Sequence, residues 1–168
     1  MTRTEYEGPT EKPRDAAAVL VFPPGVPLLT ILIGVGLNRL WPLQFWFTLS
    51  TPACYWIGGT IVVAAILGLG LHSVILVRRS GQSENPWKPT TEILDRGPFG
   101  FTRNPMYLQM VLGCGGFAII LRNTWILLLV PVCAWVLHRF AILPEEAYLE
   151  RKFGESYLSY KRRVRRWM

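Results

Sequence analysis

The chain has 168 residues, which suits one domain and leaves little room for a second. Apolar residues make up 51% of it and charged residues 17%, and the apolar residues gather in blocks of membrane-spanning length, which argues against a soluble core. The net charge of +7 comes from basic residues that flank these blocks, which indicates a negative membrane surface as the partner rather than nucleic acid.

The first 25 residues predict a cytoplasmic segment without a secretory signal peptide. Residues 1–15 are polar and carry both signs of charge, and the short apolar run 16–22 stops at Pro23 and Pro24. We expect this run to lie at the membrane interface.

Four apolar blocks follow, and each predicts a transmembrane helix. They cover about Val26 to Trp41, Ala53 to Val77, Pro105 to Leu121 and Trp125 to Leu143. The second block contains four glycines that would let neighbouring backbones approach closely, namely Gly58, Gly59, Gly68 and Gly70. The third and fourth blocks are separated only by "RNT", which predicts an antiparallel helical hairpin.

The basic residues predict how the four spans are oriented. A polar loop over residues 78–104, rich in glycine and proline, joins the second span to the third. Four spans place this loop and both termini on one side, where nearly all Lys and Arg fall. By the positive-inside rule that side is the cytoplasm, which predicts a multi-pass protein of the bacterial inner membrane.

Residues 144–168 predict an amphipathic helix on the cytoplasmic membrane surface. Basic residues alternate with apolar ones that recur at steps of four and three: Leu149, Phe153, Tyr157, Tyr160, Val164 and Trp167. Gly154 divides this helix in two. The expected fold is therefore an all-α membrane protein, a single domain over residues 1–168, with four spans in 26–143.

Cysteines and glycines inside the spans predict packing rather than chemistry. Cys54, Cys114 and Cys133 stand singly, at no metal-ligand or redox spacing, and we expect no metal site. The run "GCGG" over residues 113–116 lies within a span and follows no strand, so it favours helix packing over a cofactor loop.

Two polar clusters stand at the cytoplasmic ends of the third and fourth spans. Asn104 is a good helix N-cap and Pro105 a good first residue, and such a helix start beside Arg103 suits a carboxylate or phosphate. Glu145 and Glu146 follow the fourth span, where the helix dipole alone could favour them. Because the hairpin makes these ends neighbours, a zwitterion would meet cationic groups at one end and carboxylates at the other.

These clusters resemble a known family. "RGPFGFTRNPMY" and, after the hairpin, "EEAYLERKFGESYLSYKRRV" resemble the isoprenylcysteine carboxyl methyltransferases and their bacterial relatives, and the N-P-M-Y run is also similar to phospholipid N-methyltransferases. The resemblance covers about Thr90 to Trp167. It implies an integral membrane enzyme that uses S-adenosylmethionine and releases S-adenosylhomocysteine.

The resemblance also implies which residues surround the cofactor: Arg103, Asn104, Tyr107, Glu145 and Glu146. We add Pro105 and Gln109, which lie in the same helix start, as candidate cofactor-binding residues. Together with the charges, it leads us to expect Arg103 and the helix start at Asn104 to hold the cofactor carboxylate. Glu145 or Glu146 would take the ammonium or the ribose hydroxyls. The chain departs from the family at Phe99-Gly100, where a Tyr-Arg pair is usual, and at Gln109, where glycine is common.

A methyl acceptor that is an amine or thiol would need a base, whereas a carboxylate would not. His72 and His138 lie in the cytoplasmic halves of their spans and are candidate bases, with hydrogen-bonded packing as the alternative. Arg139 matches a basic position of the family, or snorkels from a helix end. We name Arg103, Asn104, Glu146 and His138 as the candidate catalytic residues.

The sequence therefore predicts in-line transfer of a methyl group to a lipophilic, membrane-embedded carboxylate, amine or thiol. The expected partners are the lipid bilayer and that acceptor, and no nucleic acid. The alternative is a non-catalytic membrane adaptor whose basic surface helix binds anionic lipid or a protein. A transporter ranks last, because the spans lack ionisable residues near their middle.

Overall fold

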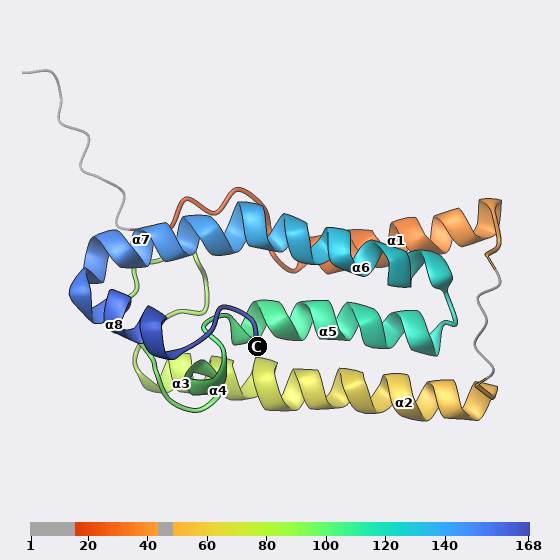
Figure 1. Ribbon diagram of the computed structural model, residues 1–168, viewed down its shortest axis with the longest axis horizontal. Helices are drawn as coiled ribbons and strands as arrows, with labels where there is room; N and C mark the ends of the chain where they lie inside the picture. The colour runs from red at the N-terminus through yellow and green to blue at the C-terminus, as the bar shows by residue number, and fades with distance from the viewer. Residues whose placement is uncertain (1–15, 44–48) are drawn as a thin grey trace, which may run out of the picture.

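The computed structural model describes residues 16–43 and 49–168, and there the chain forms four helical rods with a polar cap at one end (Figure 1). The first rod is α1 (Gly25–Leu40), and the second joins α2 (Thr51–Ala64), the π-helical η1 (Ala65–Leu71) and α3 (His72–Arg79). The short α4 (Pro98–Phe101) precedes the third rod, α5 (Pro105–Ile120). The fourth joins α6 (Thr124–Leu137), the π-helical η2 (His138–Ile142) and α7 (Leu143–Phe153), and α8 (Glu155–Arg163) follows.

Two of the rods are long and apolar enough to cross a membrane. The second rod, Thr51–Arg79, has 29 residues and the fourth, Thr124–Phe153, has 30. The other two, α1 and α5, are apolar but have 16 residues each, or about 24 Å at 1.5 Å per residue. They are shorter than the roughly 30 Å of a hydrocarbon core.

The predicted hairpin between the third and fourth blocks is confirmed. α5 ends at Ile120, and Arg122 reverses the chain with a positive φ of 48°. The Asn123 side chain then caps α6 by accepting the backbone N–H of Ile126, and it donates to the Gly34 carbonyl of α1. This turn therefore joins α1, α5 and α6 at the end of the rods that lies away from α8.

Two glycines let α2 and α5 touch along their backbones. A Cβ on Gly58 would lie 2.6 Å from the Gly116 carbonyl oxygen, and a Cβ on Gly116 would lie 2.6 Å from Val62 Cγ2. The packing prediction for the glycines is confirmed at these two positions. It is wrong for Gly59 and Gly68, because no heavy atom lies within 4 Å of a Cβ built there.

The cysteines pack as predicted. Cys54, Cys114 and Cys133 are buried as free thiols in the helical rods. In the described ranges, 16–43 and 49–168, no three His, Cys, Asp or Glu side chains lie close enough to hold a metal.

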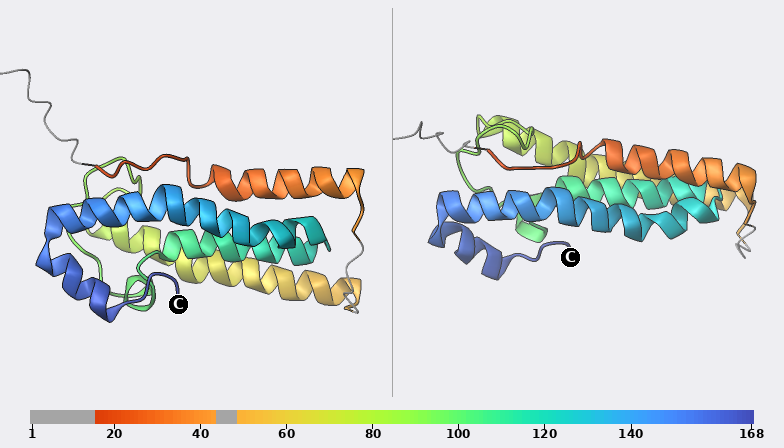
Figure 2. Two further views of the ribbon diagram at one scale, coloured as in Figure 1. Left: turned by 45° about the horizontal axis from the view of Figure 1, so that its top comes forward. Right: turned by 90° about the horizontal axis from the view of Figure 1, so that it is seen from above.

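The cap contains the 80–104 loop, α4, the end of α7, α8 and the last residues, which gather at one end of the rods (Figure 2). Gly154, with φ 52°, ends α7 and turns the chain into α8. Tyr157, Tyr160 and Val164 form a buried cluster here, with Ile93, Leu149 and Phe153 packed against it. The apolar side of the predicted amphipathic tail thus contacts the protein itself rather than being left free for lipid.

The apolar run at the start of the described chain also packs on the protein. Ala17 and Val19 are buried in a cluster with Leu137 and Ala141, and the Leu20 N–H donates to the Phe140 carbonyl at 3.0 Å. The run follows η2 as an extended segment, with alternate side chains buried. Its inner side is therefore part of the core, whereas Leu20 and Phe22 are exposed on its outer side, so the interfacial position of the run stays a prediction.

Candidate active site

The two polar clusters predicted from the sequence line one cavity in the cap. The cavity measures about 800 Å³ with its open mouth included, and its walls contain Arg103, Asn104, Glu145 and Glu146. Apolar and aromatic side chains complete it, among them Leu94, Phe99, Met106, Tyr157 and Tyr160. The hairpin thus brings together residues that are about forty positions apart in the chain.

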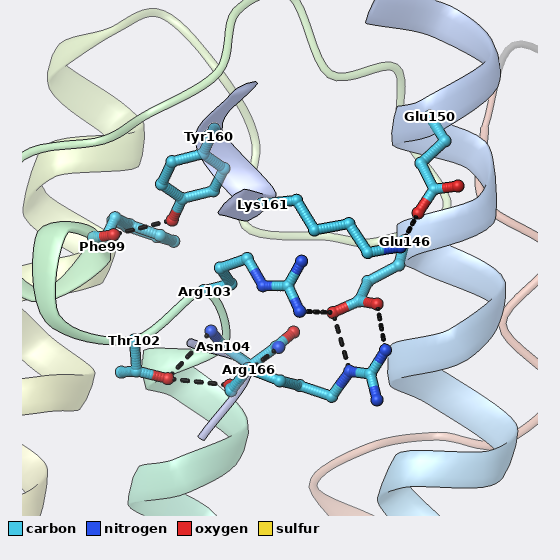
Figure 3. Close-up of polar contacts among 9 residues, drawn as sticks. All are labelled: Phe99, Thr102, Arg103, Asn104, Glu146, Glu150, Tyr160, Lys161 and Arg166. Carbon is cyan, nitrogen blue, oxygen red and sulfur yellow. Dashed lines mark hydrogen bonds and ion pairs between the residues drawn. The ribbon is translucent and has the colours of Figure 1, made fainter. Parts of the chain in front are cut away.

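The buried Glu146 carboxylate lies between the guanidinium groups of Arg103 and Arg166 (Figure 3). Glu146 Oε1 accepts Arg166 Nε at 3.0 Å, and Oε2 accepts Arg166 Nη2 at 2.7 Å. Arg103 Nη2 lies 3.2 Å from Oε1. The side chains of Arg103 and Glu146 are 6% and 5% exposed, whereas that of Arg166 is 31% exposed, so the first pair is shielded from water and Arg166 reaches it from the surface.

The surroundings decide the ionisation of the two glutamates, which lie beyond the apolar stretch that ends at Leu143. Burial opposes the charge on Glu146, but the hydrogen bond from Arg166 and the charge of Arg103 outweigh it and hold its pKa below the ordinary value. Burial, with a contribution from Glu146, raises the pKa of Glu145. Glu146 therefore favours its charged form, whereas Glu145 takes up a proton more readily than an exposed glutamate does.

Two nitrogen atoms of the Arg103 guanidinium can still donate hydrogen bonds. Its Nε and Nη1 atoms are buried, and neither has a hydrogen-bond partner among the described residues. Leaving a buried guanidinium N–H unpaired costs free energy, so these donors favour an acceptor that enters the cavity. The two N–H groups point to opposite sides of the guanidinium, so each can donate to a separate acceptor atom, and the net positive charge favours an anionic ligand.

Asn104 occupies the N-cap position of α5 but does not cap it with its side chain, and that prediction is wrong. Its amide Nδ2 instead donates to the Arg166 carbonyl at 3.1 Å, and its backbone N–H reaches Thr102 Oγ1 at 3.3 Å. Thr102 Oγ1 donates to the same Arg166 carbonyl at 2.9 Å. The helix start is therefore bound to the chain's last residues.

A second, apolar groove adjoins the polar cavity. Its volume is about 1140 Å³ with the open mouth included, and it shares Glu84, Asn85, Pro86 and Met106 with the first. Tyr107 and Gln109 line it together with apolar side chains of the segment before α1, of η1, of α3 and of the loop after α3: Phe22, Pro23, Ile66, Leu71, Val74 and Trp87. The buried Tyr107 hydroxyl donates to Glu145 Oε2 at 2.8 Å, so one hydrogen bond joins the two spaces.

An ion pair fixes the loop wall shared by the two spaces. Arg78 at the end of α3 donates through Nη2 to Glu84 Oε1 at 2.5 Å and through Nε to Oε2 at 3.3 Å. The hydrogen bond from Arg78 lowers the pKa of Glu84 to about 2, so the pair persists over the physiological pH range.

Other candidate residues lie outside both spaces. Pro105 is fully buried at the start of α5, and His138 lies in η2 with a buried Nδ1; neither lines the cavity or the groove. His72 begins α3 and is exposed. The Arg139 guanidinium lies 5.9 Å from the centre of the Phe140 ring.

Arg166 was not predicted as a site residue. The sequence predicted a surface helix up to residue 168, whereas the chain after α8 is non-helical and returns to the start of α5. Nothing in the spacing distinguishes Arg166 from Arg165 or Arg163. Only the path of the chain after α8 shows which arginine reaches Glu146.

Comparisons with known proteins give the family of the chain. A family model described as phospholipid methyltransferase matches residues 45–156. A Haemophilus influenzae protein, described as uncharacterised, is 41% identical over 63 residues, which are 38% of this chain and the whole of that relative. No solved structure matches the chain significantly.

Proposed function

We propose that this chain, which belongs to the phospholipid methyltransferase family, transfers a methyl group from S-adenosylmethionine to a lipophilic acceptor in the bilayer. The cofactor would supply an activated methyl on its sulfonium, so the protein has to align the acceptor and exclude water. The polar cavity would take the cofactor and the apolar groove the acceptor.

The proposal includes four membrane crossings, with the cap in the cytoplasm. α5 packs against both α2 and α6, so it shares their depth, although it is shorter than a typical span. α1 packs on α6 and exposes Leu28, Leu29 and Leu32 on its outer side. Such an apolar surface is stable in lipid and costly in water.

The side chains of the cavity suit the amino-acid end of the cofactor. The free donors of Arg103 would hold its carboxylate, as expected from the sequence. Glu145 and the remaining acceptor capacity of Glu146 would take the ammonium or the ribose hydroxyls. Asn104 would act through the Arg166 carbonyl that it binds, rather than as a helix cap.

The groove suits an apolar acceptor whose reactive group is not anionic. Its walls are mainly hydrocarbon and aromatic side chains, and Tyr107, which lines the groove, donates its hydroxyl to Glu145 of the adjoining cavity. A carboxylate acceptor would meet a like charge there, whereas an amine or thiol would not. An ammonium could pass a proton to the Tyr107 hydroxyl, whose own proton moves to Glu145. We therefore assign the base to Glu145 rather than to His138.

The observation that carries the proposal is the position of Arg103, which lines the cavity and has two buried N–H donors without a partner among the described residues. The Arg103→Lys variant keeps the charge beside Glu146 but loses the planar fork of donors. Calorimetry should show that S-adenosylhomocysteine binds the wild type and binds this variant at least about tenfold more weakly. Arg163→Lys, at an exposed position, is the matched control and should bind as the wild type does.

The acceptor is identified by incubating the purified protein with labelled S-adenosylmethionine and a membrane lipid extract. Label should appear in a lipid product with the wild type, and much less with Arg103→Lys. A wild type that neither binds S-adenosylhomocysteine nor labels lipid would contradict the proposal and favour the adaptor.

A further inference from the structure

We propose that Arg166 is a positioning residue of this site. The segment Val164–Met168, which we call the C-terminal strap, would fix the wall that carries Glu146 relative to the wall that carries Arg103. The inference rests on the proposed function, because it concerns how the same cavity binds the cofactor. No sequence motif assigned Arg166 a role. The structure links it to each wall by separate contacts.

The side chain of Arg166 orients one wall. Its Nε and Nη2 atoms bind both oxygens of Glu146, at 3.0 and 2.7 Å, in a bidentate pair. Such a fork fixes the plane of the carboxylate as well as its position. Because the Glu146 side chain is 5% exposed, little water competes for these oxygens.

The backbone of the strap orients the other wall. The Arg166 carbonyl accepts hydrogen bonds from Thr102 Oγ1 and Asn104 Nδ2, and the Arg165 carbonyl accepts the Arg103 N–H at 2.9 Å. Thr102 and Arg165 also form a parallel β-bridge. The residues on both sides of Arg103 are thus bound to the strap, which fixes where the Arg103 side chain leaves the backbone.

The strap is itself anchored at both ends. Val164 is buried in the cluster of Tyr157 and Tyr160, and Trp167 packs against the core cluster that contains Tyr107 and Ile142. The Tyr160 hydroxyl donates to the Phe99 carbonyl at 2.7 Å, which attaches α8 to α4. These contacts hold the strap even when the Arg166 side chain is changed, so the side chain can be tested separately.

The charges show why a second arginine matters for binding. With Arg166 on both oxygens of Glu146, Arg103 contributes one N–H to the carboxylate and keeps Nε and Nη1 unpaired. Without Arg166, Arg103 is the remaining guanidinium beside Glu146 and would rotate to pair with it fully. The donors meant for the cofactor would then be used internally, and the net positive charge of the site would be lost.

The test compares four purified, full-length proteins: wild type, Arg166→Gln, Arg166→Lys and the control Arg165→Gln. Arg165 is exposed and lies in the same strap, so its variant keeps the backbone contacts and loses an equal charge. Calorimetry with S-adenosylhomocysteine should give an affinity at least about tenfold lower for Arg166→Gln, an intermediate one for Arg166→Lys, and an unchanged one for Arg165→Gln.

A kinetic readout separates positioning from a merely structural role. With a membrane lipid extract as acceptor, Arg166→Gln should raise the KM for S-adenosylmethionine while kcat and the dependence on lipid concentration stay near wild type. Loss of folded protein would instead lower the apparent kcat without selectively raising that KM.

The outcomes distinguish this inference from the proposed function. If the wild type binds no S-adenosylhomocysteine, the proposed function fails and the inference fails with it. If the wild type binds and a folded Arg166→Gln binds equally well, only the inference is overturned. If Arg166→Gln does not fold, Arg166→Lys decides: weaker binding at an unchanged Tm supports the inference, and equal binding overturns it.

Discussion

At the residue scale, the sequence indicated which side chains meet but not how they pair. Arg103, Glu145 and Glu146 were expected at one site because a short turn forces their helices together, and all three line the cavity. The pairing of Glu146 with Arg166 could not be predicted, since several arginines near the C-terminus have the same local pattern. Asn104 was predicted to be a helix cap from its position before Pro105. Its amide instead binds the strap, a contact that only the path of the chain reveals.

The pH dependence of stability should report on Glu145. Burial raises its pKa in the folded protein, so its contribution to stability is fully present below the unfolded pKa and is lost as the pH rises through the folded value. The variant Glu145→Gln stays neutral and still can accept the Tyr107 hydrogen bond. Its Tm should exceed that of the wild type at pH 8, because the variant has no charge to bury.

Thermal unfolding in detergent from pH 8 to pH 5 checks this expectation. The difference in Tm between Glu145→Gln and wild type should shrink as the pH falls. A variant that is less stable than wild type at pH 8 would contradict the raised pKa.

At the element scale, hydrophobic blocks and turn residues predicted the rods well. The apolar lengths and the "RNT" link are local properties, and helix boundaries follow from them within a few residues. Which glycines lie between helices is not local, because it depends on how each rod is rotated about its axis. Gly58 and Gly116 face each other, whereas Gly59 and Gly68 point to open space.

The α2–α5 contact should be sensitive to a single methyl group. In Gly116→Ala the new Cβ would meet Val62 Cγ2 at 2.6 Å and the Gly58 carbonyl at 2.9 Å, and relief of this overlap should cost about 1–3 kcal/mol. The neighbouring Gly115→Ala is the matched control, since a Cβ there has no heavy atom within 4 Å. Scanning fluorimetry should show a lower Tm for the first variant and an unchanged or slightly higher one for the second.

At the scale of the whole molecule, the distribution of charge predicted a polar end and an apolar body, and the structure joins apolar rods to an end that carries the charged cavity. It did not predict that the tail's apolar residues would be buried in the cap. An amphipathic pattern identifies an apolar side without saying whether lipid or protein covers it. Here Ile93 of the loop and Phe153 at the end of α7 cover the tyrosines of α8.

The number of crossings can be read from the sides on which two exposed positions lie. Leu49 precedes the second rod and Ser156 follows the fourth. If α5 crosses the membrane, these positions lie on opposite sides; if only the two long rods cross, they lie on the same side. We expect opposite sides.

Cysteines introduced as Leu49→Cys and Ser156→Cys provide the measurement. The three natural cysteines are buried, so an impermeant maleimide should label the introduced thiols selectively. In intact spheroplasts the maleimide should label Leu49→Cys and not Ser156→Cys. In inverted vesicles it should label Ser156→Cys and not Leu49→Cys. Equal labelling of both in spheroplasts would contradict four crossings.

The position of Arg166 in the chain has a consequence for biosynthesis. Every helix, including both walls that carry Arg103 and Glu146, leaves the ribosome before the arginine that joins those walls. During translation the nascent protein can insert its hairpin while the pocket is still unfinished. If the cavity binds the cofactor as proposed, full affinity would be reached only by a polypeptide whose translation has passed α8, and prematurely terminated products would compete poorly for the cofactor.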